Sequence, residues 1–426
     1  MTHLIAYIDG NRVGSFTQDR HGQIRFTYDD DLALDQTPLS VAMPLVPGAS
    51  FKNAITKPFL QGLLPDNTLT LETLAAKYDT SASNPMKLLE HVGRDTAGAL
   101  QLLPPGVDSD DAARRTGEVE IVEDFDGLIA EIVKDAAAWQ RDRHEIRWSL
   151  AGVQPKVALY LTDDGQWAVP LDSTPTTHIL KPAATGTRHD LNEFLTMRAA
   201  KHLGLLVADH QILTTELGDH VFVSKRYDRV PVGGVLRRLH QEDFAQALSV
   251  SPARKYQVDG GPALGDFRSV FDAFPPSVTD QARRDFFDGL IYTIASINTD
   301  AHSKNYSVLH FGRQMSMAPL SDLGTNVLYD GNRTLDTAIS VGGEKVMDRI
   351  GIRHFKDAAR VLRLDWDTAE ERVHHIRREV AEAFLQARQD MLDQDRGLTR
   401  LDEDGKKYLS EIVDGIAENS RLRGWA

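Results

Sequence analysis

The chain has 426 residues, which at roughly 100 to 200 residues per domain predicts two or three domains and excludes a single small module. Hydrophobic residues make up 41% and charged residues 26% of the chain, and 31 Gly and 18 Pro are too few for a low-complexity sequence. The formal net charge is -14 at pH 7, and such a surface repels nucleic acid and anionic lipid on average. Contact with DNA would therefore need a local basic patch or a partner protein.

The chain contains no cysteine, which excludes disulfides, thiolate metal sites and thiol nucleophiles and is typical of a reducing compartment. The N-terminus, from Met1 to Gly10, has no basic region before its short apolar run, so it predicts a strand and not a signal peptide. No apolar stretch approaches the ~18 residues that a membrane-spanning helix needs. We therefore expect a cytoplasmic protein without membrane contact.

Residues 1–105 are predicted to form an N-terminal α/β subdomain, and residues 106–120 a linker. A Pro-Pro-Gly segment at 104–106 leads into the linker, which contains a run of acidic residues, and both features favour a loop. The subdomain is predicted to have strands at 4–8, 13–16 and 24–28, a helix beginning at Pro58, and helices at 69–78 and 86–92.

Residues 121–240 are predicted to form a strand-rich lobe, and residues 241–426 a helical lobe. In the first of these, apolar residues at helical spacing cover 125–133, a second helix covers 190–203, and strands are expected at 157–161, 167–169, 178–181 and 221–224. In the helical lobe, one apolar helix face covers 287–294 and a long helical pattern covers 368–391.

The strongest local signal is the segment from Ile297 to Tyr306, in which Asp300 and Asn305 are five residues apart. A predicted hairpin follows at 306–318, and Asp322 comes after it. Protein kinases have a base Asp and a metal-binding Asn at this spacing, and a further metal-binding Asp downstream. Magnesium prefers hard oxygen ligands, and a separate carboxylate can accept the proton of an attacking hydroxyl. Alone, the spacing is more typical of turns and helix caps, so the interpretation depends on its context.

A second candidate segment runs from Ser149 to Lys156 and joins a predicted helix to a strand. Its small residues Ala151 and Gly152 would let backbone amides approach a phosphate, with Lys156 close behind. The segment matches neither of the usual glycine-rich nucleotide motifs, so by spacing alone it is a polar connection.

Three further positions have both a functional and a structural interpretation. Lys181 ends a predicted strand, where it could neutralise phosphates or be a solvated edge residue. Glu193 could pair with a buried lysine, as a helix glutamate does in protein kinases, or be a first-turn glutamate that the helix dipole favours. Leu239–Phe244 could be a hinge whose main chain meets an adenine edge, with Phe244 as an apolar neighbour, or the start of a helix.

An ordered set of short motifs resembles the HipA family of serine/threonine kinase toxins. No single motif is specific, but the set spans most of the chain at about the family's usual length. In chain order the motifs are Leu63–Asn67, Ser149–Lys156, His178–Pro182, Asn192–Phe194, Lys225–Arg229, Gln241–Phe244, Asp300–Asn305 and Pro319–Asp322.

The resemblance implies an α+β, protein-kinase-like two-lobed fold with a strand-rich N-lobe, an all-helical C-lobe and an additional N-terminal α/β subdomain. It implies ATP and Mg2+ as cofactors, Asp300 as the catalytic base, and Asn305 and Asp322 as magnesium ligands. Ser149 matches the serine that these kinases autophosphorylate, which ejects the loop and stops ATP binding. The residues expected to contact the nucleotide are Ala151, Gly152, Val153, Gln154, Pro155, Lys156, Lys181, Glu242, Phe244 and His302.

The resemblance also implies partners. Family members pair with a HipB-like helix-turn-helix antitoxin on operator DNA, and some phosphorylate aminoacyl-tRNA synthetases, which arrests translation. Two alternatives remain open from the residues: a metal-dependent phosphohydrolase in which Asp300, His302 and Asp322 bind metals, and a non-catalytic protein that holds an antitoxin on DNA. A kinase is distinguished from a hydrolase by Lys181, Glu242 and Phe244, because a hydrolase has no use for these nucleotide-binding residues.

Overall fold

The computed structural model describes residues 2–107, 118–134, 149, 152, 154, 156–171, 173–183, 186–328, 335–394 and 400–425. They form two compact units. Unit 1 comprises Met1–Pro182, Ser224–Ala253 and Val308–Met315, and unit 2 comprises Ala183–Val223, Arg254–Ser307 and Ser316–Ala426. Most of the predicted linker 106–120 lies outside the described residues. The predicted boundaries at residues 105, 120 and 240 remain predictions, because each unit is assembled from several stretches of chain.

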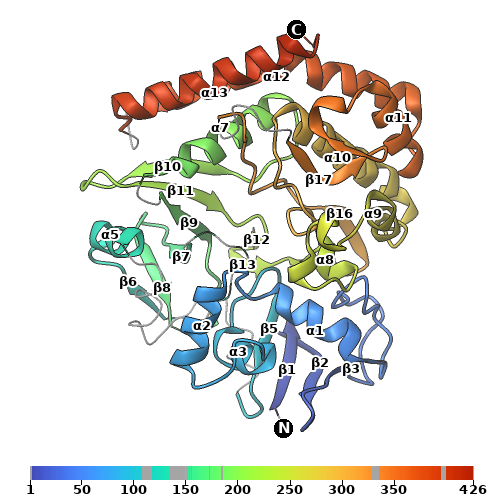
Figure 1. The fold of residues 1–426 in the computed structure, drawn as a ribbon. Coiled ribbons are helices and arrows are strands. Elements are labelled where there is room, and N and C mark those ends of the chain that lie inside the picture. Colours follow the sequence, from blue (N-terminus) through green and yellow to red (C-terminus); the bar gives the residue numbers. More distant parts are fainter. Residues whose placement is uncertain are drawn as a thin grey trace. The chain divides into compact units, whose positions relative to one another are not determined.

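The N-terminal residues of unit 1 form a five-stranded antiparallel sheet with helices beside it (Figure 1). Helices α1 and α3 pack on this sheet. The strands, in the spatial order β4-β3-β2-β1-β5, are β1 (Thr2–Ile8), β2 (Asn11–Gln18), β3 (Ile24–Tyr28), β4 (Ser50–Phe51) and β5 (Leu100–Leu103). The helices are α1 (Asn53–Gly62), α2 (Thr68–Lys77) and α3 (Pro85–Val92). The three strands and the last two helices predicted here are confirmed.

The alternation of residues along β3 explains which face of this sheet is buried. Ile24, Phe26 and Tyr28 are buried, whereas the two side chains between them are exposed or half-buried. Phe26 meets Tyr28 edge-on with 4.7 Å between ring centroids, an arrangement worth about 0.5 to 1.5 kcal/mol beyond the burial of the rings. The Tyr28 hydroxyl donates to the carbonyl of Met43 at 2.7 Å and accepts from the amide of Leu39 at 2.8 Å. The buried hydroxyl is therefore satisfied.

Helix α1 begins at Asn53, and Pro58 lies inside it, so the predicted helix start at Pro58 was wrong. Proline is favoured at the first position of a helix, where no hydrogen-bond donor is needed, and this preference suggested the start. Inside α1 the proline instead removes one intrahelical hydrogen bond. Helices α2 and α3 begin after capping asparagines, since the side chains of Asn67 and Asn84 accept hydrogen bonds from backbone amides in the first turn at 3.1 and 3.3 Å.

A second antiparallel sheet in unit 1 contains Lys181. Its strands follow the order β9-β7-β8-β6, and α5 (Phe125–Lys134) packs beside β9. The strand bounds are β6 (Val119–Ile121), β7 (Val157–Leu161), β8 (Trp167–Pro170) and β9 (His178–Pro182). Unit 1 also contains the hairpin of β12 (Arg229–Val232) and β13 (Val235–Arg238), followed by β14 (His240–Asp243) and α8 (Phe244–Ala247).

Unit 1 encloses an ionic cluster of two carboxylates, Asp95 and Asp228, and three guanidiniums, Arg226, Arg229 and Arg238, all of them buried. Asp95 accepts hydrogen bonds from Arg226 at 3.1 Å, Arg229 at 2.7 Å and Arg238 at 3.3 Å. Asp228 accepts two from Arg226 at 3.0 and 2.8 Å. Burial alone would raise the pKa of Asp95, but the three arginines hold that pKa well below its usual range. The cluster therefore ties the N-terminal subdomain to the segment that leads into β14.

Unit 2 is built around the long helix α12 (Trp366–Gln394), against which α7, α10, α11 and α13 pack (Figure 1). The helices are α7 (His189–His202), α9 (Leu264–Phe271), α10 (Pro276–Ala295), α11 (Ile352–Val361) and α13 (Glu403–Leu422), with one-turn helices η2 (Gln257–Asp259) and η3 (Met347–Arg349). The chain passes between the units after Pro182 at the end of β9, within β11 (His220–Lys225), within η1 (Pro252–Arg254), and within β15 (Ser307–Phe311) and β16 (Gln314–Met317). Strand β10 (His210–Thr214) precedes β11.

The part of the chain after residue 240 is not all-helical, and this detail of the prediction was wrong. Besides the predicted hairpin of β15 and β16, it contains the hairpin of β17 (Asp336–Val341) and β18 (Glu344–Val346). Strand β17 is buried at three consecutive positions, so it shows no period of two in the sequence, and β18 has only three residues. None of the helices in the described part of the chain combines the length and apolarity that crossing a membrane requires.

Candidate active site

The loop that carries Asp300 leaves the end of α10 through a strained turn. The amide of Asn298 donates back to the carbonyl of Thr293 at 2.9 Å. Ile297 has a φ of 56°, which is unusual for a β-branched residue, so its surroundings must hold it there. Its carbonyl accepts a hydrogen bond from the amide of Asn326 at 2.9 Å. The side chain of Asn298 accepts from the amide of Asp300 at 2.9 Å, which fixes the direction of the loop.

The structure brings Asn305 and Asp322 together. Nδ2 of Asn305 lies 3.5 Å from Oδ2 of Asp322, and Oδ1 of Asn305 accepts from the amide of His302 at 3.2 Å. Asp322 has a φ of 59°, a conformation that Asp tolerates better than most residue types. Amide and carboxylate oxygens are the ligands that Mg2+ prefers. The residue types of this pair fit a magnesium ion, but here the NH2 group of Asn305 faces Asp322, so the amide must turn before its oxygen can join the carboxylate as a ligand.

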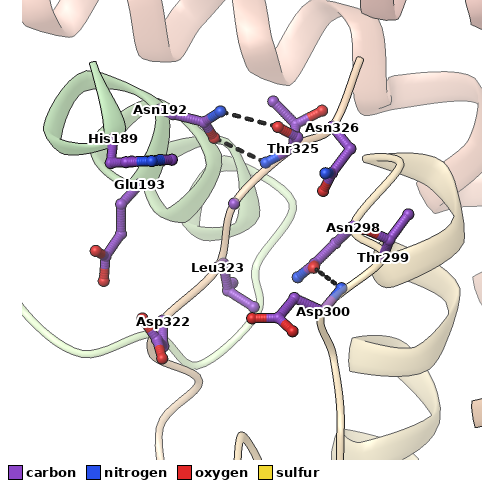
Figure 2. A pocket seen from close by; sticks show the side chains of 11 residues that line it. His189, Asn192, Glu193, Asn298, Thr299, Asp300, Asp322, Leu323, Thr325 and Asn326 are labelled. Atoms are coloured by element: carbon purple, nitrogen blue, oxygen red, sulfur yellow. Dashed lines mark hydrogen bonds between the residues drawn. The ribbon is translucent and has the colours of Figure 1, made fainter. Parts of the chain in front are cut away.

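A cavity of about 310 Å3 in unit 2 is lined by both Asp300 and Asp322. Figure 2 shows these two residues and Glu193 extending their carboxyl groups into the space beside α7. A volume of this size is at the lower end of the range for small-molecule sites. The lining residues are His189, Asn192, Glu193, Asn298, Thr299, Asp300, Asp322, Leu323, Gly324, Thr325 and Asn326.

Asn192 holds two walls of this cavity together. Its side-chain amide donates to the carbonyl of Thr325 at 2.8 Å and accepts from the amide of Thr325 at 2.7 Å (Figure 2). Both residues are buried, so the pair of hydrogen bonds fixes the segment after Asp322 against α7. Sequence reasoning missed this role. The available signal was the polar pair of Asn192 and Glu193 between two apolar residues of a helix.

Tyr256 contacts the predicted base, and no local sequence pattern indicated this contact. The Tyr256 hydroxyl donates to Oδ1 of Asp300. Its ring meets His302 edge-on, with 4.9 Å between ring centroids. His302 is buried, and its Nδ1 accepts from the amide of Lys304 at 3.3 Å. The predicted contact of His302 with the nucleotide stays a prediction.

The predicted phosphate loop lies in unit 1, and Ala151, Val153 and Pro155 lie outside the described residues. The Ser149 hydroxyl is buried and donates to the carbonyl of Leu63 at 2.7 Å, while its amide donates to the carbonyl of Asp95 at 2.9 Å. Gly152 has a φ of 108°, and a Cβ there would lie 2.4 Å from Nζ of Lys156. The Lys156 ammonium therefore rests in space that only glycine leaves open. The predicted roles of Gly152, Gln154 and Lys156 remain predictions.

The carboxylate of Glu242 is held by hydrogen bonds inside unit 1. It accepts from the hydroxyl of Ser40 at 2.5 Å and from the amide of Val41 at 2.7 Å, and Nε2 of His310 lies 2.9 Å from it. Glu242 and His310 are buried. A nucleotide contact by Glu242 would therefore use its main chain, as the hinge interpretation expects. Lys181 is half-buried in β9, and nothing in the geometry of unit 1 decides its role.

The structure confirms a helix start in the segment before α8, whereas the adenine hinge stays a prediction. Glu242 belongs to the short strand β14, whereas Asp243 caps α8 by accepting from the amide of Gln246 at 2.7 Å. The side-chain oxygen of Gln246 in turn accepts from the amide of Asp243 at 2.9 Å, which completes a capping box. Phe244 begins the helix and is fully buried. The strand end and the helix start are thus consecutive.

The strand-rich and helical elements define a protein-kinase-like α+β fold with an additional N-terminal α/β subdomain, which is the predicted fold class. The sequence matches two family domains: residues 4–103 match the HipA N-terminal domain, and residues 148–387 match the HipA-like C-terminal domain. The second match alone covers more than half of the chain. The chain belongs to the HipA family.

Two relatives and one solved structure are similar to this chain. "Putative kinase Y4mE" of Sinorhizobium fredii is 34% identical over 429 residues, which cover 98% of each chain. "Serine/threonine-protein kinase toxin HipA" of Shewanella oneidensis is 31% identical over 320 residues, which cover 71% of this chain and 70% of that one. A structure of the Shewanella oneidensis HipA, HipB and operator DNA complex contains a chain that matches with a TM-score of 0.81 and 24% identity, over 98% of this chain and 97% of that one. This last likeness supports the fold class.

Proposed function

We propose that the protein is an ATP- and magnesium-dependent serine/threonine protein kinase and the toxin of a toxin-antitoxin pair. The observation that carries the proposal is that Asp300 and Asp322 line one cavity of unit 2, with Asn305 in contact with Asp322. A base and two oxygen ligands are the set that phosphoryl transfer to a hydroxyl requires. Relatives named as a kinase toxin and as a putative kinase support the same activity.

In this mechanism Asp300 accepts the proton of the attacking serine or threonine hydroxyl through its carboxylate. Asp322 and, once its amide has turned, Asn305 would hold a magnesium ion through their side-chain oxygens, and the ion would neutralise charge on the phosphates. Lys181 and the main chain of residues 151–156 are assigned to the phosphates, and the main chain of Glu242 to the adenine, on the family motifs that they match.

We propose Ser149 as the site of inhibitory autophosphorylation. Its hydroxyl faces the carbonyl of Leu63, and its amide is held by the carbonyl of Asp95, so the loop must move before phosphate can be transferred to it. A phosphoserine carries about -1.5 to -2 charges at neutral pH and its oxygens only accept hydrogen bonds. It would therefore repel the carbonyl that the hydroxyl now contacts, which keeps the modified loop from returning.

The proposed partners are a helix-turn-helix antitoxin of the HipB type and, through it, operator DNA. The support is the Shewanella oneidensis complex of HipA with HipB and operator DNA. Because this chain has a net charge of -14, we expect most of the DNA affinity to come from the antitoxin dimer. A gel shift at physiological salt checks this. Equal affinity for DNA with and without the antitoxin would contradict it.

The central test is Asp300→Asn, with Asp285→Asn as the matched control. Asp285 lies on α10, where it accepts from Gln281 at 2.8 Å, and it does not line the cavity. We expect Asp300→Asn to lower phosphoryl transfer from labelled ATP to a cell extract by about 10²- to 10⁴-fold with ATP binding retained. The control should retain activity. Near-normal transfer by Asp300→Asn would refute the assignment.

Mapping the labelled sites by mass spectrometry identifies the substrate in the same experiment. An aminoacyl-tRNA synthetase is the candidate that the family suggests, and a serine or threonine on such an enzyme should be modified. Label on small molecules alone would count against a protein kinase.

A further inference from the structure

Tyr256 lies on a closed turn beside the candidate base. It directly precedes η2, and its carbonyl accepts from the amide of Gly261 at 2.9 Å. A Cβ at Gly261 would lie 2.1 Å from the carbonyl oxygen of Arg254 and 2.5 Å from that of Tyr256, so the turn admits no side chain at this position. The tightness of the turn restricts where the Tyr256 side chain can go.

Two further contacts fix this turn to its neighbours in unit 2. The carbonyl of Lys255 accepts from the amide and the hydroxyl of Ser303 at 3.3 and 3.0 Å, and Ser303 belongs to the same loop as Asp300. On the other side, Oε1 of Gln257 accepts from the amide of Ser340 in β17 at 2.8 Å. The residues on both sides of Tyr256 are therefore anchored.

The Tyr256 hydroxyl donates to Oδ1 of Asp300. A carboxylate has two oxygens with about four lone-pair sites, so a hydrogen bond to one oxygen does not by itself prevent the carboxylate from accepting a substrate proton. A phenol stays protonated at neutral pH, and its hydrogen bond to a carboxylate is charge-assisted and directional. Such a bond restricts rotation of the carboxylate about its last side-chain torsion, which is otherwise soft.

We propose that Tyr256 is a positioning residue that orients the carboxylate of Asp300 for proton abstraction from the protein substrate. This role rests on the proposed kinase function and deepens it. The competing role for the same contact is a plug, in which the tyrosine hydroxyl occupies the base in place of a substrate hydroxyl. The two roles predict opposite effects when the hydroxyl is removed.

The test is Tyr256→Phe, which removes one oxygen and keeps the ring that packs against His302. Casein serves as a generic serine-containing acceptor, and transfer is measured over a range of MgATP concentrations. We expect kcat to fall by about 10- to 100-fold, since misorienting a catalytic group costs rates of this order. The KM for MgATP should stay within about twofold, because the lost bond holds no nucleotide group in this mechanism.

A double-mutant cycle separates orientation of Asp300 from a general structural effect. In the Asp300→Asn background, Tyr256→Phe should cause no further loss of transfer, because both changes remove the same function. Tyr292→Phe is the matched control: its buried hydroxyl donates to the carbonyl of Thr196 at 2.6 Å, so we expect a lower melting temperature with unchanged kcat. Thermal melts of all variants show whether each one folds.

Equal or higher kcat in Tyr256→Phe would overturn the positioning role, and an increase would establish the plug. A parallel loss of kcat and MgATP affinity would also overturn it. These results leave the kinase proposal intact as long as the wild type transfers phosphate and Asp300→Asn does not. An inactive wild type would overturn the kinase proposal and the role of Tyr256 with it.

Discussion

Removing one charge from the buried ionic cluster should destabilise unit 1 strongly. In Asp95→Asn, three guanidiniums remain with one carboxylate, Asp228, and the new side-chain NH2 group points a donor at arginine donors. Asp95 now accepts from all three arginines and, at 3.1 and 2.7 Å, from the amide and hydroxyl of Thr176. Removing one partner of a buried ion pair costs about 3 to 5 kcal/mol, because the other charge stays buried without compensation. We therefore expect the free energy of unfolding of unit 1 to fall by about that amount.

Hydrogen exchange of β7 and β9 peptides in increasing urea measures this change in unit 1 alone. Asp29→Asn is the control, because it makes the same substitution in unit 1 at a surface pair, where Arg12 lies 2.8 Å away with 54% of its side chain exposed. Such a pair contributes at most about 1 kcal/mol. Equal losses in the two variants would refute the reasoning.

The destabilisation caused by Asp95→Asn should also depend on pH. The pKa of Asp95 is lowered in the folded protein, so its ionised form contributes stability above the ordinary pKa of 3.8, and this contribution is lost as the pH falls through the lower folded value. The stability difference between the wild type and Asp95→Asn should therefore narrow below about pH 4. A constant difference down to pH 2 would show that the charge of Asp95 is not the cause.

Three other predictions concern Lys181, His240 and Ser149. Lys181→Met should weaken MgATP binding by about tenfold or more in calorimetry, because a charge-assisted hydrogen bond is worth about 1.5 to 3 kcal/mol, whereas Lys225→Met, at an exposed strand end, should not. Burial and the adjacent His310 lower the pKa of His240 to about 4, so the urea midpoint should fall as the pH drops from 6.5 towards 4, and His240→Gln should flatten this slope. Protein phosphorylated at Ser149 should lose ATP affinity and regain it after phosphatase treatment; unchanged affinity would contradict the switch.

Much of the local structure could be predicted because it depends on short patterns. Strand β1 follows from a short apolar run, β3 from apolar alternation, and α10 and α12 from apolar faces of helical period. The hairpin of β17 and β18 could not be found, since β17 is buried at consecutive positions without alternation and packs against α9 and α11 through the fold. The start of α1 was missed because a proline that usually begins a helix lies inside this one.

Some residues of the candidate site could be predicted from local sequence, whereas others come together only in the folded chain. Asp300 and Asn305 are five residues apart, so one segment indicated both. Asp322 was indicated because it follows the predicted hairpin that comes after Asn305. Tyr256 could not be found, because it lies 44 residues before Asp300 and reaches it only through the fold. Asn192 and Thr325 are 133 residues apart, so their pairing is equally invisible in the sequence.

Ser149 is held by residues that are far from it in the sequence. Asp95 contributes twice: its side chain accepts from three arginines about 130 to 140 residues later in the chain, and its main chain accepts from the amide of Ser149. The Ser149 hydroxyl contacts a second N-terminal residue, Leu63. Any shift of Asp95 that weakens the ionic cluster therefore also moves an acceptor of Ser149. The N-terminal subdomain and the proposed phosphate loop share one set of buried contacts, so their stabilities are coupled.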